Sequence, residues 1–335
     1  MKENKTSWFN QFFTKTTLAW IGVIVLGFVL MAASYIAGLV SAYTQNIIMN
    51  IAINIILSVG LNLVVGYAGQ FSLGHAGFMA IGAYVGAIVS QEIPGQAGFL
   101  AGLLAGMVVT AVVALIVGIP TLRLRGDYLA IATLGVSEII RITIMNLEIT
   151  NGAAGISGVP RHVTWITMYV FVVITTLLVV NYIYSSPGRA TIAVREDEIA
   201  AESVGIHTTT YKTLAFVIGA VTASIAGTLY ACYFGVINPS QFTFQKSIDI
   251  LVIVVFGGIG SISGSFVASI LLGLLNTFLA PFGQVRPILY AAALILIMIF
   301  KPSGLMGEYE FQFSKLFNRK RGQSQAVAKE ESEDQ

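Results

Sequence analysis

Charged residues are scarce in this chain of 335 residues. Asp, Glu, Lys and Arg make up 10% of the sequence, whereas hydrophobic residues make up 56%. Soluble domains usually carry about a quarter charged residues, so this composition excludes an ordinary soluble protein. The formal net charge of +2 also gives no indication of a nucleic-acid partner.

Cysteine and histidine are nearly absent as well. Cys232 is the single cysteine and lies within an apolar run, which excludes a disulfide framework and a cysteine metal site. His75, His162 and His207 are far apart in the chain, so no metal site is expected. No P-loop, nucleophile–base pair, carboxylate dyad or cofactor fingerprint occurs. We therefore expect no enzyme and no cofactor, and any energy from ATP has to come from another chain.

The sequence contains long stretches without charged residues. No Asp, Glu, Lys or Arg occurs between Lys15 and Glu92, and further uncharged stretches are 93–122, 162–188, 213–245 and 250–285. A membrane helix needs about 20 apolar residues, so most of these stretches hold one or two spans. Breaks at Gly, Pro, Asn and Gln predict spans at 18–40, 46–65, 71–91, 98–119, 128–147, 164–184, 213–236, 248–262, 264–282 and 287–301.

The predicted fold class is an all-α polytopic membrane protein with about eight to ten transmembrane helices. The break between the predicted spans 248–262 and 264–282 allows more than one topology. Its sequence, "FGGIGSISGS" (256–265), is either a tight turn or an interruption within one discontinuous helix. The positive-inside rule places both termini in the cytoplasm. It leaves only Arg161, Lys246 and Arg286 outside, with Arg141 within a span.

This topology divides the chain into three parts. Residues 1–17 form a cytoplasmic N-terminal segment, and residues 18–301 form the transmembrane domain. Residues 302–335 form a cytoplasmic tail that is disordered at its end, since it is charged and poor in apolar residues.

The polar interval 185–212 faces the cytoplasm in this topology. Its centre, Glu196–Gly205, combines helix-favouring residues with Gly205 in place to end a helix. Charges lie on one side, and the other side carries Ile199, Ala200, Ala201 and Val204. Such an amphipathic helix can dock into a groove on a partner, or it can be a connector that rests on lipid headgroups.

The segment "GYAGQFSLGHAGFMAIGAYVGA" (66–87) combines apolar character with many glycines and a few polar side chains. Glycines let helices approach closely, and they allow local unwinding where the backbone lines a cavity. One interpretation is therefore a translocation path or gate formed by Gly69, Gln70, Ser72, Gly74, His75 and Gly77. The other is that the glycines only provide packing notches and the polar groups bond neighbouring helices. For the segment as a whole we predict the path or gate.

Glu138 and Arg141 lie three residues apart on one face of the fifth predicted span. A charge near the bilayer centre costs about 2.5–3.5 kcal/mol on insertion scales, so both should face protein or water. The spacing predicts an intramembrane ion pair that holds this span against the bundle. Direct contact with a substrate is the alternative.

A resemblance to a known family rests on four motifs in order. "IAAESVG" (199–205) resembles the EAA coupling motif of ABC importer permeases, with Ile199 in place of its first Glu and Glu198 just before it. The runs "GYAGQFSLGHAGFMAIGAY", "LRLRGDYLAIATLGVSEIIRI", "GRATIAVREDEIAAESVGI" and "FGGIGSISGS" follow the order seen in branched-chain amino acid permeases of the LivM type. The resemblance covers roughly residues 46–304.

The resemblance implies the ABC importer permease fold in the plasma membrane of a prokaryote. The expected partners are a LivH-type permease, two ABC ATPase subunits that use ATP and Mg, and an extracytoplasmic substrate-binding protein. The short cytoplasmic helix would then be the coupling helix, and its ATPase-contacting residues would be Glu198, Ile199, Ala200, Ala201, Glu202 and Gly205.

The implied substrates are leucine, isoleucine and valine. Urea, short amides and other amino acids remain alternatives, because nothing in the residues separates them. A rival from another class is an ion-coupled secondary transporter, which would need an intramembrane carboxylate such as Glu138.

Overall fold

The computed structural model describes residues 41–124 and 126–285, together with isolated positions between 22 and 38 and between 288 and 307. The chain divides into two units, and the unit Gln45–Tyr309 contains the elements described below, apart from the first three residues of α3. The predicted segment 1–17 and the tail from residue 308 onward lie outside the described residues. The predicted spans 18–40 and 287–301 are described only at isolated positions, so the total of eight to ten spans stays a prediction.

Helices dominate the described part of the chain, which confirms the all-α class. The long helices are α3 (Ala42–Asn62), α4 (His75–Glu92), α5 (Gln96–Thr121), α6 (Asp127–Asn146), α7 (Trp165–Tyr184), α10 (Thr208–Phe234), α11 (Phe244–Gly257) and α12 (Ile262–Phe278). A π-helical turn, η1 (Leu63–Tyr67), continues α3. Short 3-10 turns are η2 (Glu148–Thr150), η3 (Gly152–Ala154), η4 (Pro239–Phe242) and η5 (Ala280–Val285).

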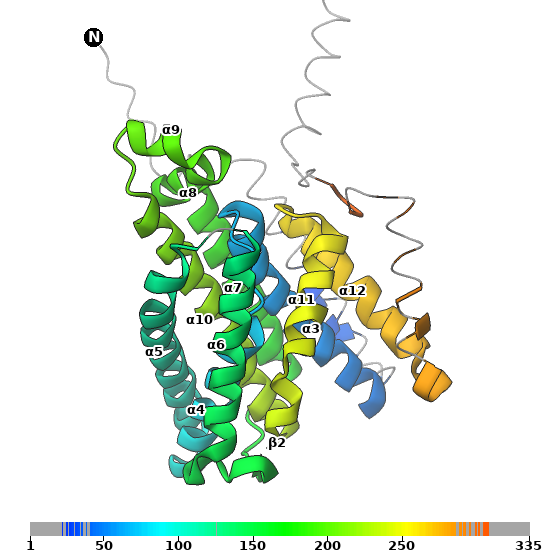
Figure 1. Ribbon diagram of the computed structural model, residues 1–335. Coiled ribbons are helices and arrows are strands. Elements are labelled where there is room, and N and C mark those ends of the chain that lie inside the picture. The colour runs from blue at the N-terminus through cyan, green and yellow to red at the C-terminus, as the bar shows by residue number, and fades with distance from the viewer. Residues whose placement is uncertain are drawn as a thin grey trace, which may run out of the picture. The chain divides into compact units, whose positions relative to one another are not determined.

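The two strands within the described residues form a small antiparallel ribbon. Strand β1 (Ile156–Ser157) pairs with β2 (Val236–Ile237), with Ile156 opposite Ile237. The ribbon ties the loop that precedes α7 to the end of α10, far from it in sequence. In Figure 1, β2 lies at the opposite end of the bundle from α8 (Ser186–Glu196) and α9 (Glu198–Ser203).

Five described helices are long and apolar enough to cross a membrane. They are Ala42–Tyr67, Gln96–Thr121, Asp127–Asn146, Trp165–Tyr184 and Thr208–Phe234. Helices α11 and α12 together form a sixth candidate, which is bent by 119° at its break. The "FGGIGSISGS" run is therefore a sharp bend between two short helices of 14 and 17 residues. Neither helix reaches the length of about 20 residues that a straight span needs.

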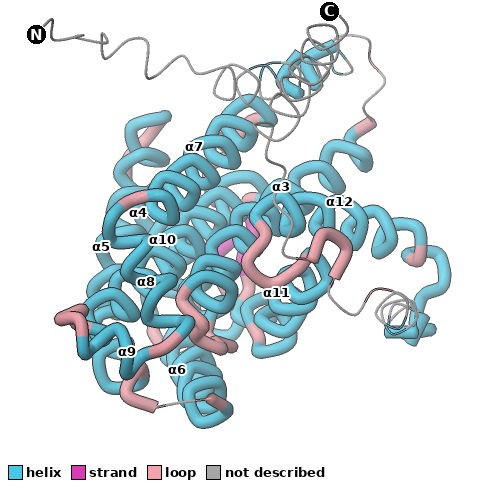
Figure 2. Tube along the Cα trace, turned by 90° about the horizontal axis from the view of Figure 1, so that it is seen from above, coloured by secondary structure: helices cyan, strands magenta, loops and turns pink. Residues whose placement is uncertain are grey.

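Helices α3, α4 and α10 form the interior of the bundle. In the most apolar windows of α3 and α10, 72% of the residues are buried, against 28% in α5, α6 and α7. Every residue of α4 from His75 to Tyr84 is buried, although α4 is not among the most apolar helices. Figure 2 shows α4 and α10 between α5 on one side and α3 on the other. The more polar helix is tolerated because protein, not lipid, surrounds it.

The third predicted span, 71–91, begins too early. Helix α4 starts at His75, because the chain leaves the π-helical turn at Tyr67 and runs without helical structure through Gly74. The local unwinding that the glycines allowed therefore occurs, and it occurs immediately before α4.

Glycines set the contact between α4 and α10. A Cβ added at Gly227 would overlap the carbonyl oxygen of Met79, and one added at Gly82 would overlap that of Ser224. The Thr228 hydroxyl, one residue farther along α10, donates to the Gly82 carbonyl at 2.9 Å. This close approach is the small-residue packing that stabilises helix pairs in membranes.

Gly227→Ala should therefore destabilise the chain by about 3 kcal/mol, at the upper end of overpacking, because the clash is with backbone. The matched control is Gly135→Ala in α6, where an added Cβ meets no atom within 4 Å. That control should be neutral or slightly stabilising, because Ala is the better helix former. Thermal unfolding of both purified variants checks this; equal midpoints would contradict the packing described here.

Candidate translocation and coupling site

The polar interval 185–212 folds into two short helices, α8 and α9. The predicted helix Glu196–Gly205 is shorter than expected, since α9 covers only Glu198–Ser203, and α8 was not predicted. Asp197 separates the two helices in an extended conformation. Its carboxylate accepts hydrogen bonds from the backbone N–H groups of Ile199 and Ala200 at 2.9 and 3.0 Å. Asp197 therefore ends α8 and caps α9.

Gly205 terminates α9, as the sequence predicted. Its φ of +84° is the left-handed conformation that favours glycine. The Gly205 N–H donates to the Glu202 carbonyl at 2.9 Å, and the Ile206 N–H donates to the Ala201 carbonyl at 3.0 Å. These two bonds form a complete Schellman motif, which turns the chain sharply into α10.

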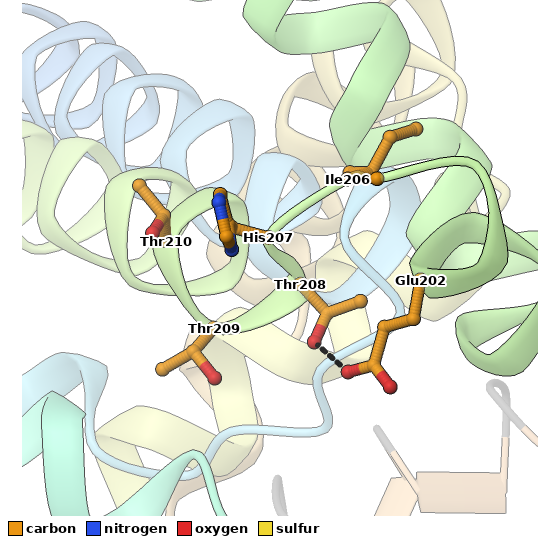
Figure 3. A pocket seen from close by; sticks show the side chains of 7 residues that line it. Glu202, Ile206, His207, Thr208, Thr209 and Thr210 are labelled. Atoms are coloured by element: carbon orange, nitrogen blue, oxygen red, sulfur yellow. Dashed lines mark hydrogen bonds between the residues drawn. The ribbon is translucent and has the colours of Figure 1, made fainter.

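One face of α9 is held against the bundle. The Lys212 ammonium lies 2.6 Å from the Glu198 carboxylate, and the Thr208 hydroxyl donates to Glu202 at 2.8 Å (Figure 3). Ala201 is only 4% exposed. The prediction placed Ala201 with the partner-facing residues, but the helix turns it inward. The acidic residues likewise have partners within the chain.

The other face of α9 is open and apolar. Ile199 and Val204 are each 75% exposed, and Ala200 lies beside them. A hollow of about 290 Å³ lies between the end of α9 and the start of α10, on the side of Glu202 (Figure 3). The hollow is lined by Glu202, Gly205, Ile206, His207, Thr208, Thr209 and Thr210. The exposed apolar face is a surface suited to a protein partner.

The predicted path segment is buried at Gln70, Ser72, Gly74, His75 and Gly77 but exposed at Gly69. Gly69 has a φ of +66°, and a Cβ added there would lie 2.7 Å from the Arg195 Cγ. Gln70 and Ser72 are each 3% exposed. Neither side-chain atom of the Gln70 amide has a hydrogen-bond partner, whereas the Ser72 hydroxyl accepts from the Gly74 N–H at 3.4 Å.

The start of α4 packs against α6. A Cβ added at Gly74 would lie 2.9 Å from the Thr133 carbonyl oxygen, and one at Gly77 would lie 2.8 Å from the Ser137 Cα. His75, the first residue of α4, is 3% exposed, and its Nε2 has no partner. Both interpretations of the segment therefore have support. The glycines do serve as packing notches, but packing does not account for the unpaired polar atoms of Gln70 and His75, since buried polar groups are normally bonded.

A cluster that the sequence reasoning missed joins α8 to two breaks in the helices. The Arg195 guanidinium, at the end of α8, donates to the Gly66 carbonyl in the π-helical turn at 2.6 Å. Asn62 accepts from the Gly260 N–H at 2.8 Å and donates to the Ser261 carbonyl at 2.8 Å. We call these five residues the α8 junction. The sequence gives no signal for this cluster, because Asn62 is one of a few polar residues in an apolar run and its partners lie far away in the chain.

Glu138 and Arg141 form an ion pair, with 2.8 Å between Arg141 Nε and Glu138 Oε2. The other Glu138 oxygen accepts from the backbone N–H of Phe244 at 3.2 Å. Since Phe244 begins α11, this carboxylate joins α6 to the first turn of that helix.

The placement of Lys246 outside the membrane stays a prediction. Its ammonium donates to the Asn54 side-chain oxygen at 3.0 Å. Asn54 lies near the midpoint of the candidate span Ala42–Tyr67, so the Lys246 ammonium lies beside the middle of that helix. Hydropathy placed the start of this span at residue 248, and α11 starts earlier, at Phe244.

Comparison with known sequences places the chain in a family. The sequence model described as "Branched-chain amino acid transport system / permease component" matches residues 43–301. The chain belongs to this permease family. It is accordingly a multi-pass membrane protein of a family of transport permease components. No solved structure matches it.

Individual relatives agree with the family. The chain is 38% identical over 264 residues to the LivM permease proteins of Salmonella typhimurium and Escherichia coli, whose names specify high-affinity branched-chain amino acid transport systems. The match covers 68% of this chain and 62% of those relatives, so the chain spans less than two thirds of their length. It is 32% identical over 154 residues to LivH of Escherichia coli, covering 45% of this chain and 49% of LivH.

Proposed function

We propose that the chain is a permease subunit of a binding-protein-dependent ABC importer for branched-chain amino acids in a prokaryotic plasma membrane. It pairs with a LivH-type permease, and both termini lie in the cytoplasm. Two ATPase subunits use ATP and Mg, and an extracytoplasmic binding protein delivers the substrate. The chain itself carries no cofactor and catalyses no reaction. Family membership and the named relatives support this proposal.

The observation that carries the coupling role is the open apolar face of α9. Ile199 and Val204 are each 75% exposed on a helix whose opposite side is anchored by Glu198 and Glu202. A helix that is fixed to the bundle and apolar on its outer side can transmit force from a partner groove. Ile199, Ala200 and Val204 then contact the ATPase, while Glu198, Ala201, Glu202 and Gly205 hold the helix in place.

The movement reaches the path through the α8 junction. Helices α8 and α9 are adjacent, and Arg195 connects α8 to the π-helical turn that precedes Gly69 and Gln70. A π-helical turn is often a functional site within a helix, because its hydrogen bonding departs from the regular pattern. Displacement of α8 then acts on the segment from Gly69 to Gly77, which opens or closes the path.

Ile199→Glu tests the coupling role. In membranes containing both permeases, we expect this variant to insert normally but to co-purify with less than a tenth of the ATPase subunits, because a charge would be buried without a partner. Ile199→Leu, the matched control, should retain ATPase binding. Normal ATPase recovery with Ile199→Glu would refute the assignment of α9.

A further inference from the structure

Helix α11 begins beside the middle of two candidate membrane spans. Its first residue, Phe244, is bonded to Glu138 near the middle of the candidate span Asp127–Asn146, and Lys246 is bonded to Asn54 near the middle of Ala42–Tyr67. The far end of α11 reaches the α8 junction, where Gly260 meets Asn62. With 14 residues the helix is about 21 Å long, which is shorter than the hydrocarbon core of about 30 Å. Transporters commonly place substrate sites where such discontinuous helices end in mid-membrane.

Two opposite charges lie one turn apart at this end of α11. Lys246 and Asp249 are both partly exposed. Their charges attract each other, but among the described residues neither group lies within 4.0 Å of an opposite charge, whereas Arg141 and Glu138 form a close ion pair. Lys246 bonds to the neutral amide of Asn54, and Asp249 bonds to the side chain of Gln245. Charged side chains within membrane-spanning regions normally pair with each other or contact a transported species.

The chemistry of the pair matches a zwitterion. An ammonium group with three donors suits a carboxylate, and a carboxylate suits an ammonium group. Residues three apart on a helix are neighbours on its surface, so both ends of one small molecule can reach them together. The first turn of α11 adds the positive end of the helix dipole near Lys246. Val252, one turn beyond Asp249, is partly buried and offers an apolar contact.

We propose that Lys246 and Asp249 form a mid-membrane subsite for the main-chain groups of an amino acid in transit. Lys246 binds the α-carboxylate, and Asp249 binds the α-ammonium group. The apolar side chain is then left to apolar contacts, which accept leucine, isoleucine and valine alike. This inference rests on the proposed function and deepens it, because it names the groups that the path recognises.

The first test replaces both charges with apolar groups of similar size, Lys246→Met with Asp249→Leu. In proteoliposomes with the complete importer, leucine uptake should fall at least tenfold, whereas assembly and the unfolding temperature should not fall. If the two charges were only structural, their joint replacement would leave transport intact, since buried pairs are often replaceable by apolar residues. Uptake within twofold of the unsubstituted importer would overturn the proposal.

The matched control removes the other two charges at this depth, Glu138→Gln with Arg141→Met. The glutamine keeps an oxygen for the Phe244 N–H, so uptake should stay within about threefold of normal. If the control loses uptake as fully as the first variant, the effect belongs to mid-membrane charge in general, and the subsite is refuted. If the unsubstituted importer shows no ATP-dependent leucine uptake, the proposed function fails instead.

A second measurement does not depend on transport. Gln245→Cys places a thiol beside Asp249, and the native Cys232 is buried. Leucine at high concentration should slow labelling of this thiol at least fivefold in the purified complex, without the binding protein. 3-Methylbutylamine lacks the carboxylate and 4-methylpentanoate lacks the ammonium group, so neither should protect. Equal protection by leucine and either analogue, or no protection by leucine, would overturn the two-charge subsite.

Discussion

Arg195→Gln should lower ATP-driven uptake by the assembled importer about tenfold or more, with the ATPase subunits still bound. Arg195 carries a charge-assisted bond of 2.6 Å to the Gly66 carbonyl, and its alkyl chain packs against Gly69. A hydrogen bond to a charged group contributes about 1.5–3 kcal/mol, which is about a ten- to hundredfold change in an equilibrium. Glutamine is too short to reach Gly66 and carries no charge. ATP hydrolysis should then continue without coupled uptake.

Arg189→Gln is the matched control for this result. Arg189 is on the same helix, but among the described residues its guanidinium bonds to Tyr184 and Ser186, within the same short stretch of chain. Its replacement should leave uptake within about twofold of normal. Uptake and ATP hydrolysis measured together on the same proteoliposomes separate loss of coupling from loss of assembly. If Arg195→Gln imports leucine as well as Arg189→Gln does, α8 does not transmit movement through Gly66.

Asn62→Leu should be strongly destabilising. The Asn62 side chain makes three hydrogen bonds of 2.8 Å, to the Gly260 N–H, the Ser261 carbonyl and the Ser265 hydroxyl. After replacement by leucine, the Ser261 carbonyl and the Ser265 hydroxyl still bond to each other, whereas the Gly260 N–H loses its partner. An unsatisfied group of this kind costs about 1–3 kcal/mol.

Asn50→Leu provides the comparison for Asn62. Asn50 lies on the same helix, is exposed, and donates only to the Asn46 carbonyl one turn earlier. Thermal unfolding of the purified complexes should show a large drop in the midpoint for Asn62→Leu and little change for Asn50→Leu. If both variants unfold at the same temperature, the bend between α11 and α12 does not depend on Asn62.

Several elements of the fold could be predicted because hydropathy reports them directly. Helices α5, α6 and α7 begin and end within about two residues of the predicted spans, since a membrane helix must be continuously apolar. Helix α10 begins at Thr208, five residues before the prediction of 213, because its first turns are polar and lie beside α9. The π-helical turn gave no signal, since its residues, Leu63–Tyr67, are as apolar as those of α3.

The candidate site was predictable as a region but not as a set of contacts. Glycine frequency identified the segment from Gly69 to Gly77, because close approach and unwinding both require residues without a side chain. The inward position of Ala201 was not predictable, since a six-residue helix has too few turns to define its buried face. The contacts of Lys246 and Asp249 were not predictable because both residues lie near the predicted start of a span at residue 248.

Membrane residence, helical class and the approximate places of the spans followed from the sequence alone, because lipid accepts only apolar helices with satisfied backbones. Tertiary packing decided which helices are interior and where α11 starts relative to its neighbours. It also brought Arg195 into contact with Gly66. Those features depend on residues up to about two hundred positions apart, such as Asn62 and Ser265. Local composition does not indicate which distant residues pair, because only the folded bundle brings these residues together.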